Sequence, residues 1–308
     1  MNVAAIALTA IAAAVLVPGQ ANAAQCKITG VTAPGVSATY DPFDVTFTPS
    51  PVSISIQTRG DNCAGAKVEL ALVTTTTSPN TGSQVRLVNG GSVILGTVLA
   101  AGQPRAIVNS TAAFTTNPLL LTVGSAGSIS GDASLALALQ PGQVGSPGVY
   151  DANLGLVALL TDTKGNQSTA DTTVNVAVTV RASVRVAAGS GQLSINLGEL
   201  KPGAVGGPIT FDAYANVNYN LLFSSDNGFV MRRGGSGSAP GVPYTPTLSN
   251  GTISIVSAGG PTAKRQASFT SPNDGRRHHS LSVTVDPFPN LGAGQYSDVM
   301  TLEIRARV

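Results

Sequence analysis

The sequence is poor in the residue types that usually mark binding or catalytic sites. Its 308 residues include no tryptophan, two cysteines and two histidines, and only 10% are charged. The 17 basic residues are scattered and the formal net charge is +2, so the chain lacks the concentrated basic surface that neutralises phosphates. No nucleic-acid partner is therefore expected.

The candidate catalytic patterns do not assemble into a known kind of site. His278 and His279 are adjacent, so on a strand they would point to opposite faces, and no third histidine could complete a metal site. Residues 235–238 come nearest to the Gly-x-Ser-x-Gly elbow of a hydrolase, but their composition is that of a flexible loop. Gly206 and Gly207 precede an expected strand, unlike a phosphate-binding loop. We predict a protein that is not an enzyme and needs no metal or other cofactor.

The chain opens with an uncharged apolar run over residues 3–17. The motif Ala21-Asn22-Ala23 follows it and has the small-x-small form that signal peptidase recognises. Pro18 and Gly19 end the run short of the roughly 20 apolar residues that span a bilayer. We expect residues 1–23 to be a signal peptide and the chain to be exported.

The only two cysteines lie close to the start of the expected mature chain. Oxidising conditions outside the cytoplasm allow Cys26 and Cys63 to form a disulfide. In the chain-entropy model a loop of this size stabilises the fold by about 3 to 4 kcal/mol. Two free structural thiols are the alternative.

Short runs of alternating apolar and polar residues recur along the chain. Clear examples are residues 52–56, 68–70, 174–180 and 281–285, and a period of two indicates strands with one buried face. Turns rich in Gly, Asn and Asp separate the runs, and the chain contains 35 glycines and 19 prolines. The pattern predicts an all-β protein. The roughly 285 residues of the mature chain favour two domains, each an immunoglobulin-like β-sandwich.

A weak internal repeat relates the two halves. Gly148-Val149-Tyr150-Asp151 leads into an apolar strand, and so does Gly294-Gln295-Tyr296-Ser297-Asp298. The first half then continues into the alternating run 174–180, whereas the second half has no matching run. The second domain is therefore expected to lack its final strand. Such a sandwich exposes a hydrophobic groove and two unpaired sheet edges, which a strand from another chain can fill.

Four segments of the second half carry a resemblance to a known family. They are LSINLGELKPG at 193–203, YNLLFSSDNG at 219–228, VPY at 242–244 and GQYSD at 294–298. In order and spacing they resemble the spore coat protein U-like domain family, which includes the pilins of archaic, Csu-type chaperone-usher pili. The resemblance covers about residues 182–308. The first half is similar more loosely, through Cys26, Tyr40-Asp41-Pro42, Cys63 and the turn at 148–151.

The resemblance implies a position in the pilus. Shaft subunits of that family carry a donor strand before their first cysteine, whereas here only Ala24 and Gln25 would precede Cys26. A subunit that receives a strand and gives none belongs at the tip. The resemblance further implies an adhesive domain over residues 24–180, closed in cis by the run 174–180, and a pilin domain over residues 181–308.

The same resemblance implies partners and a location. The chain is expected to pass through the periplasm with a periplasmic pilus chaperone, to reach the cell surface through an outer-membrane usher, and to accept a strand from an adjacent pilus subunit. Two basic pairs, Arg232-Arg233 and Arg276-Arg277, are candidate chaperone contacts. Solvated faces also carry such pairs.

Two apolar segments with the pattern of loops are candidate contacts to an abiotic or host surface. In Pro118-Leu119-Leu120-Leu121 the proline is expected to block regular strand pairing. The other segment is Val93-Ile94-Leu95. The alternative for both segments is burial in strands.

These features predict a tip adhesin that mediates surface attachment and biofilm formation through exposed hydrophobic loops. One alternative is a pilus-borne carbohydrate-binding lectin, for whose stacking contacts the first half supplies five aromatic residues: Tyr40, Phe43, Phe47, Phe114 and Tyr150. The other is a secreted coat or structural β-protein without an adhesive role, which would share the fold.

Overall fold

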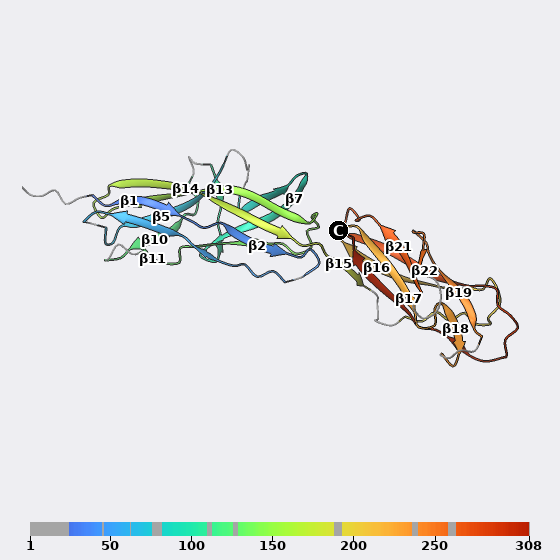
Figure 1. Ribbon diagram of the computed structural model, residues 1–308. Helices are drawn as coiled ribbons and strands as arrows, with labels where there is room; N and C mark the ends of the chain where they lie inside the picture. Colours follow the sequence, from blue (N-terminus) through green and yellow to red (C-terminus); the bar gives the residue numbers. More distant parts are fainter. Residues whose placement is uncertain are drawn as a thin grey trace, which may run out of the picture.

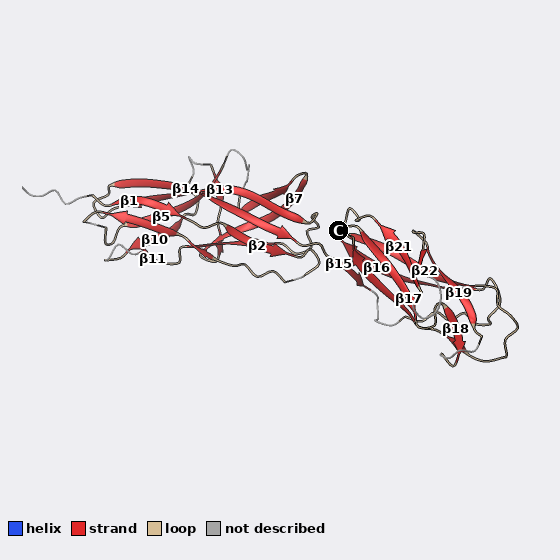
Figure 2. Cartoon of the chain, viewed as in Figure 1, coloured by secondary structure: helices blue, strands red, loops and turns tan. Residues whose placement is uncertain are grey.

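The computed structural model describes residues 25–44, 46–61, 63–75, 82–109, 113–125, 129–187, 193–235, 240–257 and 263–307. The expected signal peptide and residues 236–238 lie outside this part of the chain. Every regular element within it is a strand (Figure 2), which confirms the predicted all-β class. No helix of the described part could span a membrane.

Two sandwiches follow one another along the chain (Figure 1). One hydrophobic core collects buried residues from Cys26 to Val180, and a second collects residues from Val184 to Ile304. Because no residue belongs to both cores, we propose Val180 as the end of the first domain.

The described part of the first domain contains fourteen strands, several of them only two residues long. They are β1 (Lys27–Thr32), β2 (Val36–Tyr40), β3 (Val52–Ser53), β4 (Ser55–Arg59), β5 (Lys67–Thr74), β6 (Gln84–Asn89), β7 (Ser92–Ala100), β8 (Gln103–Pro104), β9 (Ile107–Val108), β10 (Leu119–Val123), β11 (Ile129–Ser130), β12 (Ser134–Leu139), β13 (Gly148–Thr161) and β14 (Gln167–Val180).

β13 is the central strand of this domain. Alternate side chains of β13 are buried from Tyr150 to Leu160, as the period-two pattern predicts. β14 pairs with it over its whole length, while β5 pairs with its other edge over residues 154–161. Cys26 and Cys63 form a disulfide with Cα atoms 4.9 Å apart, which confirms the predicted pairing.

The residues described in the second domain form ten strands in two sheets around its core. They are β15 (Val184–Ala187), β16 (Val205–Ala215), β17 (Tyr219–Ser225), β18 (Val230–Arg233), β19 (Val242–Leu248), β20 (Ser254–Ser257), β21 (Lys264–Phe269), β22 (Arg276–Val285), β23 (Tyr296–Ser297) and β24 (Met300–Ala306). One sheet has the order β15-β16-β22-β19-β18-β23 and the other β20-β21-β17-β24. β15 and β24 are therefore edge strands of opposite sheets.

Candidate functional site: an open sheet edge

Two tyrosines mark equivalent positions in the two domains. The Tyr150 hydroxyl donates to the carbonyl of Ser146 at 2.8 Å, and the Tyr296 hydroxyl donates to the carbonyl of Gly292 at 2.7 Å. Each bond reaches back four residues, as in the tyrosine corner at the start of a late strand in immunoglobulin-like sandwiches. The shared bond confirms the internal repeat, and it makes β13 and β24 the corresponding strands.

The first domain has a strand beside β13 that closes it. β14 is antiparallel to β13 and, on its other edge, parallel to β2, with Val176 opposite Val36 and Val180 opposite Tyr40. The inward side chains of its second half, from Val174 to Val180, are at most 2% exposed. The run 174–180 thus occupies the closing position that the sequence predicted.

The second domain has no described strand at that position. β24 pairs with β17 along one edge, and within the described residues nothing pairs with its other edge. β15, the counterpart of β2, pairs only with β16. The inward side chains along both edges are only partly buried: Val184, Val186, Met300, Leu302 and Ile304. Two free backbone edges with partly buried apolar side chains therefore face each other across the candidate groove between β15 and β24.

Asp298 fixes the start of β24. Its carboxylate accepts hydrogen bonds from the Ser225 hydroxyl, from the Tyr244 hydroxyl at 2.7 Å, and from the Asn227 side-chain amide at 3.0 Å. Burial, followed by the neighbouring Asp298, raises the pKa of Tyr244, so this hydroxyl remains a donor. Three segments that carry the sequence resemblance, 219–228, 242–244 and 294–298, meet at this one carboxylate.

His279 supports the same domain from inside its core. The ring is fully buried, stacks on Phe211 at a centroid distance of 5.2 Å, and contacts the Tyr219 hydroxyl through Nε2 at 2.8 Å. Its Nδ1 lies 3.0 Å from Oδ1 of Asn250, whose amide group donates to the carbonyl of His278 at 2.7 Å. Since that second bond fixes Oδ1 as an acceptor, Nδ1 carries the proton and Nε2 accepts from Tyr219. Burial lowers the pKa of His279 to about 4, so the ring is neutral.

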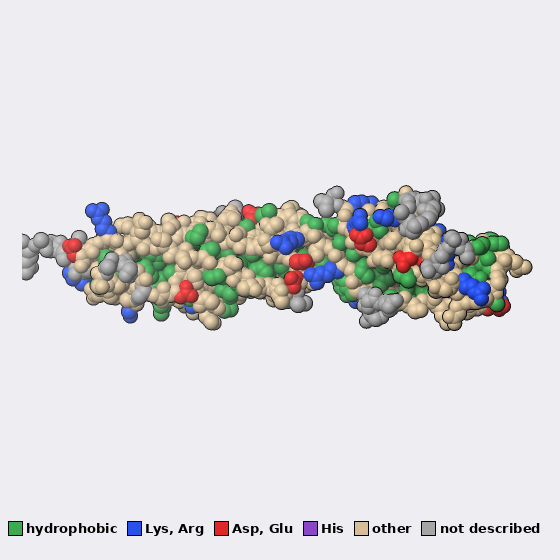
Figure 3. All heavy atoms as spheres, turned by 60° about the horizontal axis from the view of Figure 1, so that its bottom comes forward, with side chains coloured by type: hydrophobic (Ala, Val, Ile, Leu, Met, Phe, Trp, Pro, Cys, Tyr) green, Lys and Arg blue, Asp and Glu red, His purple; other side chains and the backbone are tan. Residues whose placement is uncertain are grey.

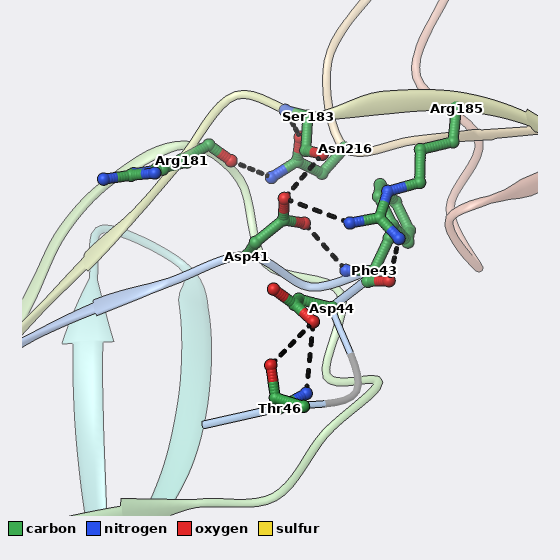
Figure 4. A network of polar contacts seen from close by, with 8 residues as sticks. All are labelled: Asp41, Phe43, Asp44, Thr46, Arg181, Ser183, Arg185 and Asn216. Carbon is green, nitrogen blue, oxygen red and sulfur yellow. Dashed lines mark hydrogen bonds and ion pairs between the residues drawn. The ribbon is translucent and has the colours of Figure 1, made fainter. Parts of the chain in front are cut away.

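Asn216 joins the two domains (Figure 4). Its side-chain amide donates to the carbonyl of Gly145 at 3.1 Å and of Arg181 at 2.8 Å, and its Oδ1 accepts from the Ser183 backbone N–H at 2.8 Å. The side chain is buried, so these partners replace water. Asn216 of the second domain thus bonds both to Gly145 of the first domain and to residues 181–183, which connect the two domains.

A second group of contacts lies beside Asn216 (Figure 4). The Asp41 carboxylate accepts from the Ser183 hydroxyl at 3.1 Å and pairs with Arg185 at 3.6 Å, while Arg185 also donates to the carbonyl of Phe43 at 2.6 Å. The rings of Phe43 and Tyr214 meet edge to face at 5.9 Å. The junction therefore combines polar and aromatic contacts.

The predicted hydrophobic loops are strands, which corrects the loop interpretation. Leu119 and Leu121 are buried in β10, and Ile94 is buried in β7. Pro118 lies one residue before β10 begins, where no ladder hydrogen bond from its nitrogen is needed, so it does not prevent pairing. Leu120 is 66% exposed.

The second segment lies in the β6–β7 hairpin, where Val93 is 37% exposed and Leu95 is half-buried. This hairpin lies near the domain junction, because the Leu95 N–H donates to the side chain of Gln143.

The two basic pairs lie far apart. Arg276 and Arg277 begin β22 at the junction end of the second domain, where Arg276 pairs with Asp212 at 2.6 Å and Arg277 lies over the Phe269 ring. Arg232 and Arg233 end β18 at the opposite pole (Figure 1).

The histidine pair lies as the sequence predicted. His279 is in the core, while His278 points outward and contacts Asp212 at 3.0 Å. The described residues contain no group of three or more potential metal ligands. Sequence reasoning missed the roles of Asp298 and Asn216, because both side chains bond to residues that are distant in the chain. The one sequence signal was for Asp298, which lies in the segment 294–298 that carries the family resemblance.

No protein-family model matches the chain, and no curated protein sequence matches it. Among solved structures, it is similar to a chaperone–tip adhesion subunit complex, CsuC–CsuE, from archaic chaperone-usher Csu pili of Acinetobacter baumannii. The TM-score is 0.47 and the identity 13%, over 91% of this chain and 99% of that chain. The CupB6 tip adhesin of Pseudomonas aeruginosa gives a TM-score of 0.36 and 11% identity, over 92% and 94% of the two chains. CfaE, the adhesive subunit of CFA/I fimbria of enterotoxigenic Escherichia coli, gives 0.26 and 11%, over 90% and 99%.

Proposed function

We propose that the chain is the tip adhesin of a chaperone-usher pilus and that its second domain accepts a donor strand from the next subunit. The observation that carries the proposal is the contrast between β14, which closes the first domain, and the unpaired edges of β15 and β24. The partly buried side chains of Met300, Leu302 and Ile304 are the apolar surface that an inserted strand would cover.

The groove favours a strand with alternating apolar side chains. Covering a half-exposed aliphatic side chain contributes up to about 1.5 kcal/mol, and the backbone edges of β15 and β24 supply ladder hydrogen bonds in addition. A periplasmic chaperone would occupy the same edges before assembly, with the basic pairs at Arg233 and Arg276 as its candidate contacts. An outer-membrane usher and export through the periplasm to the cell surface belong to this proposal.

The first domain indicates the direction of the incoming strand. By analogy with β14, the strand would run antiparallel to β24 and parallel to β15. β24 ends at the junction, where the Arg307 N–H donates to the carbonyl of Asn218 at 2.7 Å. The C-terminal end of an antiparallel strand would therefore emerge at the pole near β18, away from the first domain (Figure 1). A subunit that donates its N-terminal segment would lie there without meeting the first domain.

Surface attachment and biofilm formation are assigned to the first domain. Leu120, on the outer face of β10, is the candidate hydrophobic contact. The lectin alternative has less support, because none of the five aromatic side chains of this domain is exposed and Tyr40 and Tyr150 are at most 2% exposed. A coat protein without an adhesive role would share the groove only if it also polymerises by strand exchange.

The test is strand binding by the exported chain. A peptide copying the N-terminal extension of a shaft subunit from the same pilus should raise the unfolding temperature of the second domain and leave that of the first unchanged. Leu302→Ser should weaken peptide binding, because Leu302 points into the groove. Glu303→Gln is the matched control, since its side chain points outward on the same strand. A monomeric, stable chain that ignores the peptide would refute the proposal.

A further inference from the structure

The end of the first domain farthest from the junction carries a group of cations. Gly145 lies at the domain junction, where its carbonyl accepts from Asn216, and β13 begins three residues later. The 14 residues of β13 extend about 45 Å from there, so Thr161 lies at the far end of the domain. Lys67 is paired with Thr161, and Lys164 lies in the turn that follows β13. Both lysines therefore lie at the distal end.

Lys27 and Arg59 lie at the same end. They are cross-strand partners on β1 and β4, and the neighbouring Ile28 N–H donates to the Ser168 hydroxyl at 3.0 Å, beside the start of β14. All four cationic side chains are exposed, and none of them forms an ion pair with a described residue. Figure 3 shows Lys and Arg side chains at several places around this end of the molecule, with an acidic side chain among them.

Charge is separated along the first domain. The first domain has six Lys and Arg residues; four of them lie at the distal end, and Arg86 and Arg105 lie outside it. Of its eight acidic residues, Asp61 and Asp162 belong to the distal end, and Glu69 lies two residues from Lys67 on β5. Asp162 is 5% exposed, and its carboxylate accepts hydrogen bonds from Lys164 and Asn166 within its own turn. The distal end is therefore cationic, whereas the rest of the domain is anionic.

We propose that the distal end, formed by Lys27, Arg59, Lys67 and Lys164, binds an acidic polysaccharide that carries sulfate, phosphate or carboxylate groups. This deepens the adhesive role proposed above by naming the partner class. Unpaired exposed cations are free to meet anions of a polymer. A bilayer fits less well, because no large hydrophobic side chain among the described residues of the distal turns is exposed; Leu120 lies on the side of β10.

The test measures binding of the exported chain to immobilised heparin, with neutral dextran as the reference polymer. Wild-type protein should bind heparin and elute as salt is raised. Each single substitution, Lys27→Gln, Arg59→Gln, Lys67→Gln or Lys164→Gln, should weaken binding about fivefold, and the quadruple variant about six-hundredfold. The charge-matched control, with Lys201→Gln, Lys264→Gln, Arg305→Gln and Arg307→Gln in the second domain, should bind as wild type.

Three outcomes would overturn the proposal. They are absence of heparin binding by the wild type, equal losses in the distal and control variants, and tighter binding to duplex DNA or to phosphatidylglycerol-containing vesicles than to heparin. The donor-strand peptide serves as the folding check. If it still stabilises the second domain of a protein that ignores heparin, the polysaccharide inference fails and strand acceptance stands.

Discussion

Acid should destabilise the second domain through His279. Burial lowers its pKa from 6.5 to about 4, so between these values the unfolded chain takes up a proton that the folded domain excludes. This contribution to stability is complete above about pH 6.5 and is lost as the pH falls toward 4. At pH 4.5 the free energy of unfolding should be about 2.5 kcal/mol lower than at pH 7.5 through this group alone. For a domain of roughly 120 residues, that is about 10 °C in Tm.

Calorimetry of the full exported chain at the two pH values checks this. The transition of the first domain is identified by its response to reductant, because the Cys26–Cys63 disulfide belongs to that domain. The His279 ring contacts Tyr219 and Asn250 and faces the charged groups of Arg277, His278 and Asp212. Substituting His279 and His278 in turn separates the titration of His279 from the effects of these neighbours. His279→Gln should remove about 2.5 kcal/mol of the acid-induced loss, because glutamine does not titrate. His278→Gln, which changes the exposed neighbouring histidine, is the control and should keep the acid-induced loss of unfolding free energy. An unchanged acid response in His279→Gln would refute the reasoning.

Two further substitutions probe the polar contacts. Asp298→Asn should lower the free energy of unfolding of the second domain by about 2 to 3 kcal/mol in urea titrations, because the hydroxyls of Ser225 and Tyr244 lose a charged acceptor. Asp226→Asn on the adjacent exposed turn is its control, and equal effects would contradict the role of Asp298. Asn216→Asp should broaden the interdomain distance distribution between spin labels, since a carboxylate cannot donate to the carbonyls of Gly145 and Arg181. Asn218→Asp should not, because Asn218 Oδ1 only accepts from Ser271; a narrow distribution in Asn216→Asp would contradict the proposed tie.

Local patterns predicted the strands because alternation determines which face of a strand is buried. The closing role of the run 174–180 was implied by the family resemblance, and the internal repeat predicted the matching tyrosines. Pro118 was misinterpreted because a proline interrupts a ladder only where its nitrogen must donate, and here it precedes the first paired residue of β10. The hydrogen bonds of Asn216 to Gly145 and of Asp298 to Tyr244 could not be predicted, since they connect segments whose proximity exists only after folding.

The cationic end could not be found from net charge, because a formal value of +2 averages over a chain whose charges are separated in space. Lys27, Arg59, Lys67 and Lys164 are dispersed over more than a hundred positions of sequence, and pairing of β1 with β4 and of β5 with β13 brings them to one end. The unpaired edges of β15 and β24 belong to the other domain, whose core shares no residue with the first. The proposed strand acceptance and the proposed polysaccharide binding therefore depend on different residues, so a variant should be able to lose either property and keep the other.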